Sequence, residues 1–431
     1  GVSVLLKAGH LTEDRLVDIF YDNEAGYAGG AAIALAGNWE GNESPDLDEG
    51  GFAATFAKGG TEANLPNGTL AKFAGLTLNN SAGSSFAFTA GTDASARIGD
   101  LGIKADDAAA GEAELWNKFE FTPSDAFEGR WSLAEDGLEV ARGALAVPEV
   151  APHARGRIAL PQPRGFRPKP GAECHYRVSF HLKADASWAE KGFEIAHDQL
   201  PFGRVERPAE APRTFAPEVA EDAGSVTLRG GPTEIVFSRR TGTVSRLTMN
   251  GKTILEDEQG IVAGPRLTCG RALTDNDYRW LSKPFTDSGL TQLRHHARPI
   301  EIVRDGDGTW VRCEVAVTSS KSAAFAHVAR WTVDADGTVT VRNESEPRGE
   351  CPVLPRLGLS LKLKGAFERM LWFGHGPLEN YVDRNGGSDV GLYDSTVTEQ
   401  FVDYVRPQDN GYKSGVRWVA FADGEGDGVM F

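Results

Sequence analysis

Apolar and polar residues alternate with a period of two along much of the chain. From Cys174 to Leu182 every second side chain is apolar, and polar side chains stand between them. The same alternation recurs over residues 311–317, and residues 357–363 carry a leucine at every second position. Successive side chains of a strand point to opposite faces, so this period predicts strands with one buried face.

Turn signals separate these runs. Asn250-Gly251 and Asp336-Gly337 each stand between two apolar stretches. Such dipeptides supply the residues with positive φ that a type I′ hairpin turn needs. Only residues 12–20 could form a helix, with Thr12 as its cap, and a strand over residues 16–21 fits that segment equally well. Short strands with frequent turns predict antiparallel sandwiches.

The chain divides into three parts of different character. Residues 1–107 are acidic and rich in glycine and alanine, residues 114–201 form a second part, and residues 222–431 form a third. The Ala-rich stretch 104–113 and the Pro-containing stretch 202–224 read as linkers. We therefore predict an all-β protein of three consecutive antiparallel β-sandwich domains.

Composition and charge exclude several classes of protein. The 431 residues are 40 % hydrophobic and 25 % charged, which is typical of a soluble globular chain rather than a collagen or a disordered one. The longest nearly uncharged run, residues 25–37, is shorter than the roughly 20 residues that span a bilayer. A net charge of −16 argues against nucleic acid as a partner. The missing initiator Met suggests an excised or incomplete chain.

Candidate metal, nucleotide and nucleophile motifs are missing from the sequence. The four cysteines lie far apart, so no structural zinc site, and no other metal or cofactor, is expected. Cys174 and Cys313 occupy inward strand positions and are predicted to be buried thiols, and one disulfide stays open. His295 and His296 are adjacent, so they should point to opposite faces of a strand. Gly374-His375-Gly376 is interpreted as a turn.

Four ordered motifs in the third part resemble the last domain of the glycoside hydrolase family 2 β-galactosidases. They are Arg271-Ala-Leu-Thr-Asp-Asn-Asp277, Gly374-His-Gly-Pro-Leu-Glu-Asn-Tyr-Val-Asp-Arg384, Tyr404-Val-Arg-Pro-Gln-Asp-Asn-Gly411 and Val416-Arg-Trp418, after an opening at residues 237–249. The resemblance implies the supersandwich of the family's small chain, or domain 5, truncated at its C-terminal side. A shortened sheet would expose an unpaired edge and make the domain marginally stable.

The second part is similar to the immunoglobulin-like domain that precedes this last domain in the family. The matching segments are Trp116-Asn-Lys-Phe-Glu-Phe121, Gly129-Arg-Trp-Ser-Leu133 and Ile158-Ala-Leu-Pro161. The resemblance covers residues 114–431. Residues 1–107 lie outside it and weakly resemble cohesin-like sandwich modules.

The family's catalytic machinery is not expected in this chain. Members are retaining glycosidases with two catalytic glutamates on a TIM barrel that needs about 250 residues. Only 113 residues precede the resemblance, and they do not alternate strands with helices. Gly41-Asn42-Glu43 imitates the family's acid/base motif, but its surroundings favour an acidic turn. No catalytic residue is therefore assigned.

The resemblance does suggest residues that border a galactoside pocket. By analogy, Asp275, Asn276, Asp277 and Tyr278 would help to wall the pocket of the full enzyme. A structural turn is the competing interpretation, because Asp and Asn side chains bond nearby backbone N–H groups. Leu273 stands where the family usually has proline, which leaves the reach of this loop open.

Two further groups have competing interpretations. Glu379, Asn380 and Tyr381 with Asp383 and Arg384 fit either an interface network or a satisfied buried ion pair. The tryptophans at positions 372 and 418 fit either a sugar-stacking surface or the core, and the core is the commoner place.

Three functions follow from the resemblance. The chain is the C-terminal region of a β-galactosidase and adds architecture and part of the pocket wall, or it is a non-catalytic small subunit of a barrel-bearing chain, or it is a carbohydrate-binding adhesive protein. The expected partner is a β-galactoside, reached through a barrel in the parent chain or in a partner subunit, and the full enzyme could be a homo-oligomer. No membrane partner is expected, and both cytoplasmic and secreted bacterial locations stay open.

Overall fold

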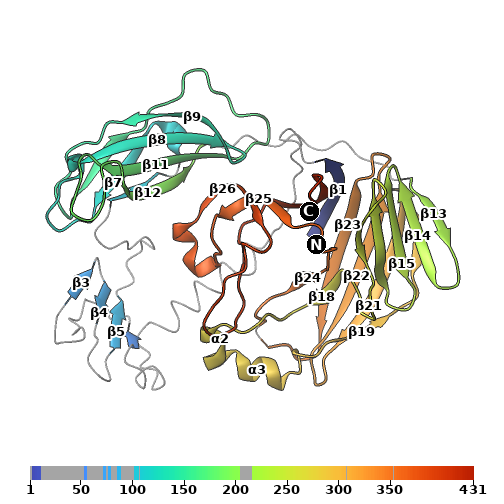
Figure 1. Cartoon of the computed structure of the whole chain (residues 1–431). Coiled ribbons are helices and arrows are strands. Elements are labelled where there is room, and N and C mark those ends of the chain that lie inside the picture. The colour runs from blue at the N-terminus through green and yellow to red at the C-terminus, as the bar shows by residue number, and fades with distance from the viewer. Residues whose placement is uncertain are drawn as a thin grey trace. The chain divides into compact units, whose positions relative to one another are not determined.

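A computed structural model of the chain describes residues 101–105, 107–203, 216–306, 308–352 and 354–431, together with the backbone of five strands before residue 101. The chain folds into two compact units (Figure 1). Unit 1 comprises Gly1–Asp22, Glu210–Tyr381 and Leu392–Phe431, and unit 2 comprises Asn23–Ala209 and Val382–Gly391. The secondary structure is almost entirely strand, as predicted. Among the described residues, no helix has both the length and the apolar character needed to cross a membrane.

One layer of unit 1 is a five-stranded antiparallel meander. Its strands follow the chain order and are β13 (Glu218–Glu221), β14 (Ser225–Gly230), β15 (Thr233–Ser238), β16 (Thr243–Met249) and β17 (Lys252–Glu256). Asn250 and Gly251 join the last two strands with φ values of 50° and 77°, so the predicted hairpin with two positive φ values is confirmed.

The second layer is a large sheet. Along it lie β19 (Arg294–Ala297), β21 (Gly308–Thr318), β22 (Ala324–Val333), β23 (Val339–Arg348), β1 (Val2–His10), β28 (Asp427–Met430), β27 (Trp418–Ala422), β25 (Arg369–Gly376) and β26 (Asp389–Thr396), and β20 (Glu301–Asp305) pairs with β21. The residues of β26 up to Gly391 are assigned to unit 2 and the rest of the strand to unit 1. Between β22 and β23 the prediction of a type I′ turn at Asp336-Gly337 is wrong. Only Gly337 has a positive φ there, in a longer loop closed by the bond from the Asp334 N–H to the Thr338 carbonyl.

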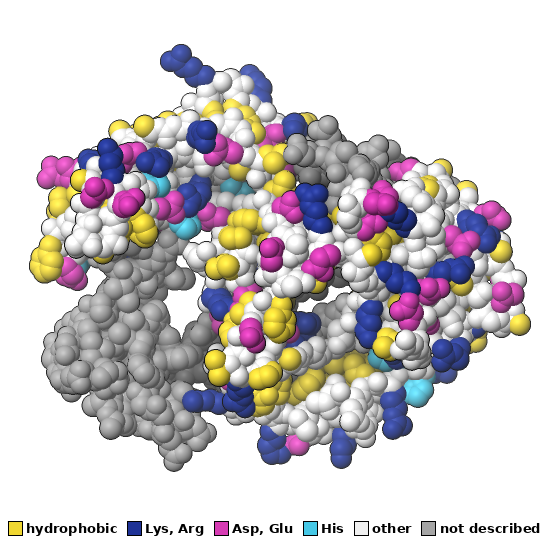
Figure 2. All heavy atoms as spheres, in the orientation of Figure 1, with side chains coloured by type: hydrophobic (Ala, Val, Ile, Leu, Met, Phe, Trp, Pro, Cys, Tyr) yellow, Lys and Arg dark blue, Asp and Glu magenta, His cyan; other side chains and the backbone are white. Residues whose placement is uncertain are grey.

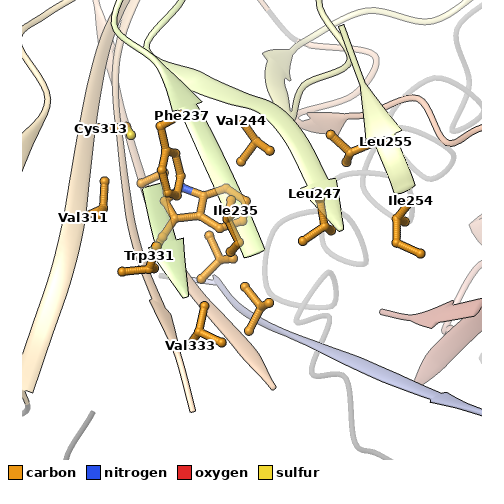
Figure 3. Close-up of a cluster of buried hydrophobic side chains, with 14 of the residues drawn as sticks. Ile235, Phe237, Val244, Leu247, Ile254, Leu255, Val311, Cys313, Trp331 and Val333 are labelled. Carbon is orange, nitrogen blue, oxygen red and sulfur yellow. The ribbon is translucent and has the colours of Figure 1, made fainter. Parts of the chain in front are cut away.

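The two layers of unit 1 enclose an apolar core. Figure 3 shows side chains of the meander, among them Ile235 and Phe237, facing Val311 and Trp331 of the large sheet. Phe237 is fully buried, and its ring meets that of Trp331 edge to face at 5.6 Å. The alternation of the sequence places these apolar side chains on the inner faces, and their burial is the main source of stability for a sandwich.

Strand β28 is paired on both sides. It pairs with β27 and with β1, and β1 also pairs with β23. The unpaired edge that was expected at this end of the last domain is therefore not found at β28, because the strand at residues 2–10 supplies the partner. Nothing in the sequence pattern of those residues specified that pairing.

The leucine alternation over residues 357–363 yields only a short strand, β24 (Gly358–Ser360), paired with β18 (Arg266–Thr268). The longer strand predicted there is wrong because the leucines serve different clusters. Leu359 packs against the cluster around Leu267, whereas Leu361 and Leu363 pack against the main core. Leu357 is exposed.

Unit 2 contains a sandwich of four and three strands. One sheet has the order β12 (Glu194–Pro201), β11 (Cys174–Leu182), β8 (Phe127–Glu135), β9 (Leu138–Leu145), and the other has the order β10 (Arg155–Ala159), β7 (Glu112–Asn117), β6 (Leu101–Lys104). Seven strands in sheets of four and three are typical of an immunoglobulin-like sandwich. Its core contains Leu115, Ile158, Tyr176 and Phe180.

The stretch 104–113 is not a linker, contrary to the prediction. Leu101 and Ile103 of β6 are buried in the core of the sandwich, as is Ala108, which is fully buried in the short turn η2 (Ala108–Ala110). The sheet therefore begins before residue 114, because Ala108 and Ala113 pack into the core, whereas Ala109 and Ala110 remain exposed. Of the second predicted linker, residues 204–215 lie outside the described residues, and β13 forms near its end.

The four remaining strands form a small sheet with the order β2 (Ala53–Thr55), β5 (Ser85–Phe88), β4 (Leu76–Leu78), β3 (Ala71–Phe73), in which β2 and β5 are parallel. The predictions for residues 12–20 and for Gly41-Asn42-Glu43 lie outside the described residues. All four cysteines are free, and Cys174 and Cys313 are buried as predicted.

Candidate functional site

The signature segment after β18 folds into a short helix, α2 (Asp275–Trp280). Thr274 caps it: the Thr274 hydroxyl accepts a hydrogen bond from the Asp277 N–H, and the Asp277 carboxylate accepts one from the Thr274 N–H at 2.9 Å. This reciprocal capping box explains why a helix begins at the Asp-Asn-Asp motif. A second helix, α3 (Ser282–Asp287), follows directly.

Asp277 points inward. Its carboxylate receives two hydrogen bonds from the Arg271 guanidinium, at 2.9 and 3.1 Å, and Asp277 is only 6 % exposed. Burial acts to raise the pKa of Asp277, but the ion pair with Arg271 and the bonds from Thr274 outweigh it and hold that pKa below its usual range. A bidentate ion pair between Arg271 and Asp277 thus joins the first and last residues of the motif.

Asp275, Asn276 and Tyr278 point outward. All three are exposed, and Asp275 pairs with Arg406, whose Nη1 lies 3.4 Å from the Asp275 Oδ1. The same guanidinium lies 4.2 Å from the centre of the Tyr278 ring, which is a cation–π distance. Of the four predicted pocket residues, the structure therefore presents three to solvent and commits Asp277 to holding the helix.

The third motif packs against the second. Tyr404 donates a hydrogen bond to Glu379, the Gly411 N–H donates to the other Glu379 oxygen at 2.9 Å, and the Tyr381 hydroxyl donates to Asp409 at 2.9 Å. Asp409 also pairs with Arg356 at 2.8 Å. Burial, followed by the bond to Asp409, raises the pKa of Tyr381. This network keeps the loops beside α2 in one arrangement.

Asn380 is the fully buried member of this network. Its amide oxygen accepts bonds from the N–H and the hydroxyl of Ser414 at 2.7 and 2.6 Å, and its amide nitrogen donates to the Leu378 carbonyl at 3.2 Å. A buried amide with all these partners fixes loop geometry. The buried-network interpretation thus describes Asn380 best.

Asp383 and Arg384 follow this group along the chain. They belong to the segment Val382–Gly391, which is part of unit 2, whereas Glu379, Asn380 and Tyr381 belong to unit 1. The chain passes from one unit to the other between Tyr381 and Val382.

The tryptophans at positions 372 and 418 are core residues. Trp372 is 1 % exposed and Trp418 is 4 % exposed, and the Trp372 Nε1–H donates to the His375 carbonyl at 3.0 Å. Neither ring is available to stack on a sugar in this arrangement.

An acidic turn between β27 and β28 has the composition of a cation site. One carboxylate oxygen each of Asp423, Glu425 and Asp427 lie within 4.8 Å of one another. The Lys252 ammonium already lies 2.6 to 2.7 Å from all three carboxylates. Its charge neutralises the turn in the way a metal ion would, and the hydrogen bonds to Asp423, Asp427 and Glu425 raise the pKa of Lys252.

We define the α2 face as the exposed residues Asp275, Asn276, Tyr278 and Arg406 together with Val405, which precedes Arg406 in the chain. Val405 is fully exposed. Figure 2 shows hydrophobic side chains at the surface around α2. Apolar side chains beside a carboxylate, an amide and a guanidinium can contact both the face of a sugar ring and its hydroxyl groups, or another protein surface.

Two residues of this arrangement, Arg271 and Arg406, were not singled out from the sequence. Both stand inside the quoted motifs, Arg271 at the start of the first and Arg406 in the third. The sequence offered one signal for them: motifs that are separate in the chain but belong to one family signature lie close together in space when they form the same site. Sequence alone did not say which acidic residue each arginine would pair with.

Two family models match the chain. A model described as β-galactosidase small chain matches residues 229–431, and one described as β-galactosidase domain 4 matches residues 113–203. The chain belongs with the C-terminal region of the β-galactosidases of glycoside hydrolase family 2. The order of the two domains is the order predicted from the motifs.

Curated β-galactosidases are similar over the same region. The enzyme of Priestia megaterium is 27 % identical over 326 residues, which are 75 % of this chain and 31 % of the relative. That of Lactobacillus delbrueckii subsp. bulgaricus is 29 % identical over 320 residues, 73 % of this chain and 30 % of the relative. The chain thus spans about a third of the length of the curated relatives it matches.

Proposed function

We propose that this chain is the C-terminal region of a retaining β-galactosidase, which hydrolyses terminal β-D-galactosides, and that it supplies architecture and part of the substrate pocket wall. The catalytic acid/base and nucleophile would lie on a barrel outside this chain. The observation that carries the proposal is the α2 face, where Asp275, Tyr278 and Arg406 from two separate family motifs meet at the surface.

The buried contacts behind this face support a positioning role. Arg271 and Asp277 hold α2 from within, and Glu379 and Tyr381 hold the neighbouring loop. A pocket wall must be rigid before substrate arrives, because ordering it during binding would cost affinity. Exposed polar groups on a braced support fit that requirement.

The first test is the coding sequence on both sides of this segment. A reading frame that continues into a TIM-barrel pattern identifies the chain as part of one longer enzyme. Nitrophenyl β-D-galactoside should then be hydrolysed by the complete protein and not by the 431-residue chain alone. Hydrolysis by the chain alone would refute the proposed division of labour.

Substitutions in the complete enzyme test the pocket wall. Asp275→Asn and Tyr278→Phe should lower kcat/KM for the galactoside about 3- to 10-fold, the size of one lost polar contact. Asp287→Asn on the neighbouring helix α3 is the control, because its carboxylate is exposed and, among the residues that the structure describes, pairs with Lys283 alone. Equal kcat/KM values for Asp275→Asn and Asp287→Asn would remove Asp275 from the pocket wall.

A separate small subunit is the second candidate, favoured by the description of the matching model as a β-galactosidase small chain. A stop and a start codon at the borders of the segment, with a barrel-encoding gene beside it, would support this candidate. Activity should then appear only when both chains are mixed. Saturable binding to a galactose-containing polymer, with no hydrolysis in any mixture, would instead support the adhesive protein.

A further inference from the structure

A pocket with a volume of about 600 Å³ lies in unit 1 beside the ribbon of β18 and β24. Arg266 and Thr268 are two positions apart on β18, and Ser360 of β24 is paired with Arg266 in the register of the ribbon. All three side chains line the pocket, as does Lys362 two residues further on. The alternation of side chains in a strand explains why these polar groups share one face.

Apolar side chains form another part of the lining, which also includes Arg271, Thr291 and His295. Phe285 of α3 and Leu290 after it are buried at 3 % exposure each, and Leu293 packs with them. Gly270 makes room for the Phe285 ring, because a Cβ at that position would lie 2.7 Å from the ring atom Cζ. The pocket thus places an apolar wall beside several polar and cationic groups, and a small-molecule site uses both kinds of group.

The charge of the pocket is one-sided. Arg266, Arg271 and Lys362 line it, and none of its described lining residues is acidic, although the whole chain has 61 acidic against 45 basic residues. Arg271 is neutralised by Asp277. Arg266 and Lys362 make no side-chain hydrogen bond or ion pair with any residue that the structure describes, so two cationic groups remain to attract an anion.

Arg266 is the more confined of the two. It is half-buried, and this burial lowers its pKa, whereas the nearby Asp257 carboxylate acts on it only through space. A half-buried guanidinium without a hydrogen-bonded partner is unfavourable, and a carboxylate is the group that its planar fork matches best.

We propose that this pocket binds a small organic carboxylate with an apolar body, whose carboxylate pairs with Arg266 and whose body lies against Phe285 and Leu290. Lys362 adds a second positive charge at the rim, and the hydroxyls of Thr268 and Ser360 supply further donors. This binding needs no galactoside and no catalytic barrel, so its test is independent of the proposed function.

The probes are phenylbutyrate and phenylbutanol, which share one carbon skeleton and differ in the anionic group. Isothermal titration calorimetry of the 431-residue chain at physiological salt should show that phenylbutyrate binds at least about tenfold more tightly than the alcohol, the size expected for a charge-assisted pair. Inorganic phosphate, which lacks an apolar body, should displace phenylbutyrate only at much higher concentration.

Arg266→Gln should weaken phenylbutyrate binding at least about tenfold. Arg294→Gln is the matched control, because it removes the same charge from the exposed face of the neighbouring strand β19 outside the pocket lining, and it should change affinity less than about twofold. Lys362→Gln is a second variant on an exposed side chain that should fold normally and weaken binding severalfold.

Three results would overturn the proposal. They are equal affinity for the acid and the alcohol, equal loss in the Arg266 and Arg294 variants, and no binding of phenylbutyrate at millimolar concentration by the folded chain. Circular dichroism of each variant confirms that the chain is folded before its affinity is interpreted.

Discussion

A histidine on a strand of unit 1, His327 of β22, and one on a strand of unit 2, His197 of β12, have opposite surroundings. His327 in unit 1 is 6 % exposed, and its Nδ1 lies 2.9 Å from the Ser345 hydroxyl. Burial lowers the pKa of His327 to about 4, and the nearby His295 adds to the effect. His327 is therefore held neutral.

His197 in unit 2 lies among carboxylates. Its Nδ1 is 2.8 Å from Glu194, and its Nε2 is 3.5 Å from Asp389. Pairing with Asp389 raises the pKa of His197. Arg177 completes the cluster with two bonds to Glu194, at 2.7 and 3.0 Å, and one to Asp389 at 2.8 Å. The partners that surround a histidine on a sheet thus decide in which direction its pKa moves.

The largest expected effect on the free energy of unfolding concerns the apolar core of unit 1. Phe237→Ala empties a fully buried site in unit 1 and should lower the free energy of unfolding of that unit by about 3–5 kcal/mol. Urea unfolding with hydrogen exchange resolved by peptide should show the loss in unit 1. Phe121→Ala is the control, because that ring is 91 % exposed, and it should cost less than about 0.5 kcal/mol. Equal losses would mean that Phe237 is not packed as described.

The next largest expected effect is a loss of stability of unit 1 in acid. A histidine with a lowered pKa stabilises the fold fully above its ordinary pKa of about 6.5, and that stability is lost as pH falls towards the folded value. For His327, with a folded pKa of about 4, the loss is on the order of 3 kcal/mol over this range. Urea unfolding of unit 1 between pH 7 and pH 4 measures it, and His327→Gln should flatten the curve.

The cluster around His197 should respond with the opposite sign. Its raised pKa gives stability that is complete below about pH 6.5 and lost as pH rises through the folded value. Burial opposes ionisation of Asp389, but His197 and Arg177 hold the pKa of Asp389 below its usual range, so its contribution disappears only in stronger acid. Protection of β11 and β12 from hydrogen exchange should rise from pH 7 to pH 5, and a fall would contradict the assignment.

Arg177→Met sharpens the charged side of the comparison. It removes the guanidinium that Glu194 and Asp389 share and should destabilise unit 2 by about 2 kcal/mol, less than for a fully buried pair because these side chains are 22 to 32 % exposed. Arg130→Met is matched to it, because the pair of Arg130 with Glu128 is more exposed, and should cost less than about 0.5 kcal/mol. A similar small cost for both would show that the cluster is fully solvated.

The smallest effect concerns one hydroxyl. Tyr176 of unit 2 is fully buried, stacks on Trp131 at 5.3 Å and donates to the Pro161 carbonyl at 3.0 Å. Tyr176→Phe keeps the ring and should cost about 1 kcal/mol in thermal unfolding. Tyr278→Phe on the α2 face should leave stability unchanged, and a comparable loss there would mean that Tyr278 is not solvent-exposed.

The alternation of apolar and polar residues and the turn residues predicted much of this fold, and the family motifs predicted which family the chain resembles. The strand Cys174–Leu182 and the hairpin at Asn250-Gly251 follow from alternation and from positive-φ residues, which act within a few positions. The pairing of β1 with β28 joins residues more than 400 positions apart, and no local pattern specifies such a partner. The alanines in the stretch 104–113 were interpreted as a linker because alanine is equally compatible with an exposed turn and with a buried core position.

The sequence predicted which residues make up the candidate site, but not which of them face solvent and which hold the structure. The signature located Asp275, Asn276, Asp277 and Tyr278, but the capping box turned Asp277 inward to Arg271 and left the others outside. The orientation depends on the phase of a six-residue helix, which sequence spacing does not set.

The segment Val382–Gly391 makes the two units inseparable by any single cut of the chain. It belongs to unit 2, yet residues of unit 1 precede and follow it. A chain trimmed to the domain 4 match, residues 113–203, would lose Asp389 and leave Arg177 and His197 without one of their partners. One protease cut in a connecting stretch would therefore release neither unit, and transplanting the sandwich of unit 2 into another enzyme would require moving this segment with it.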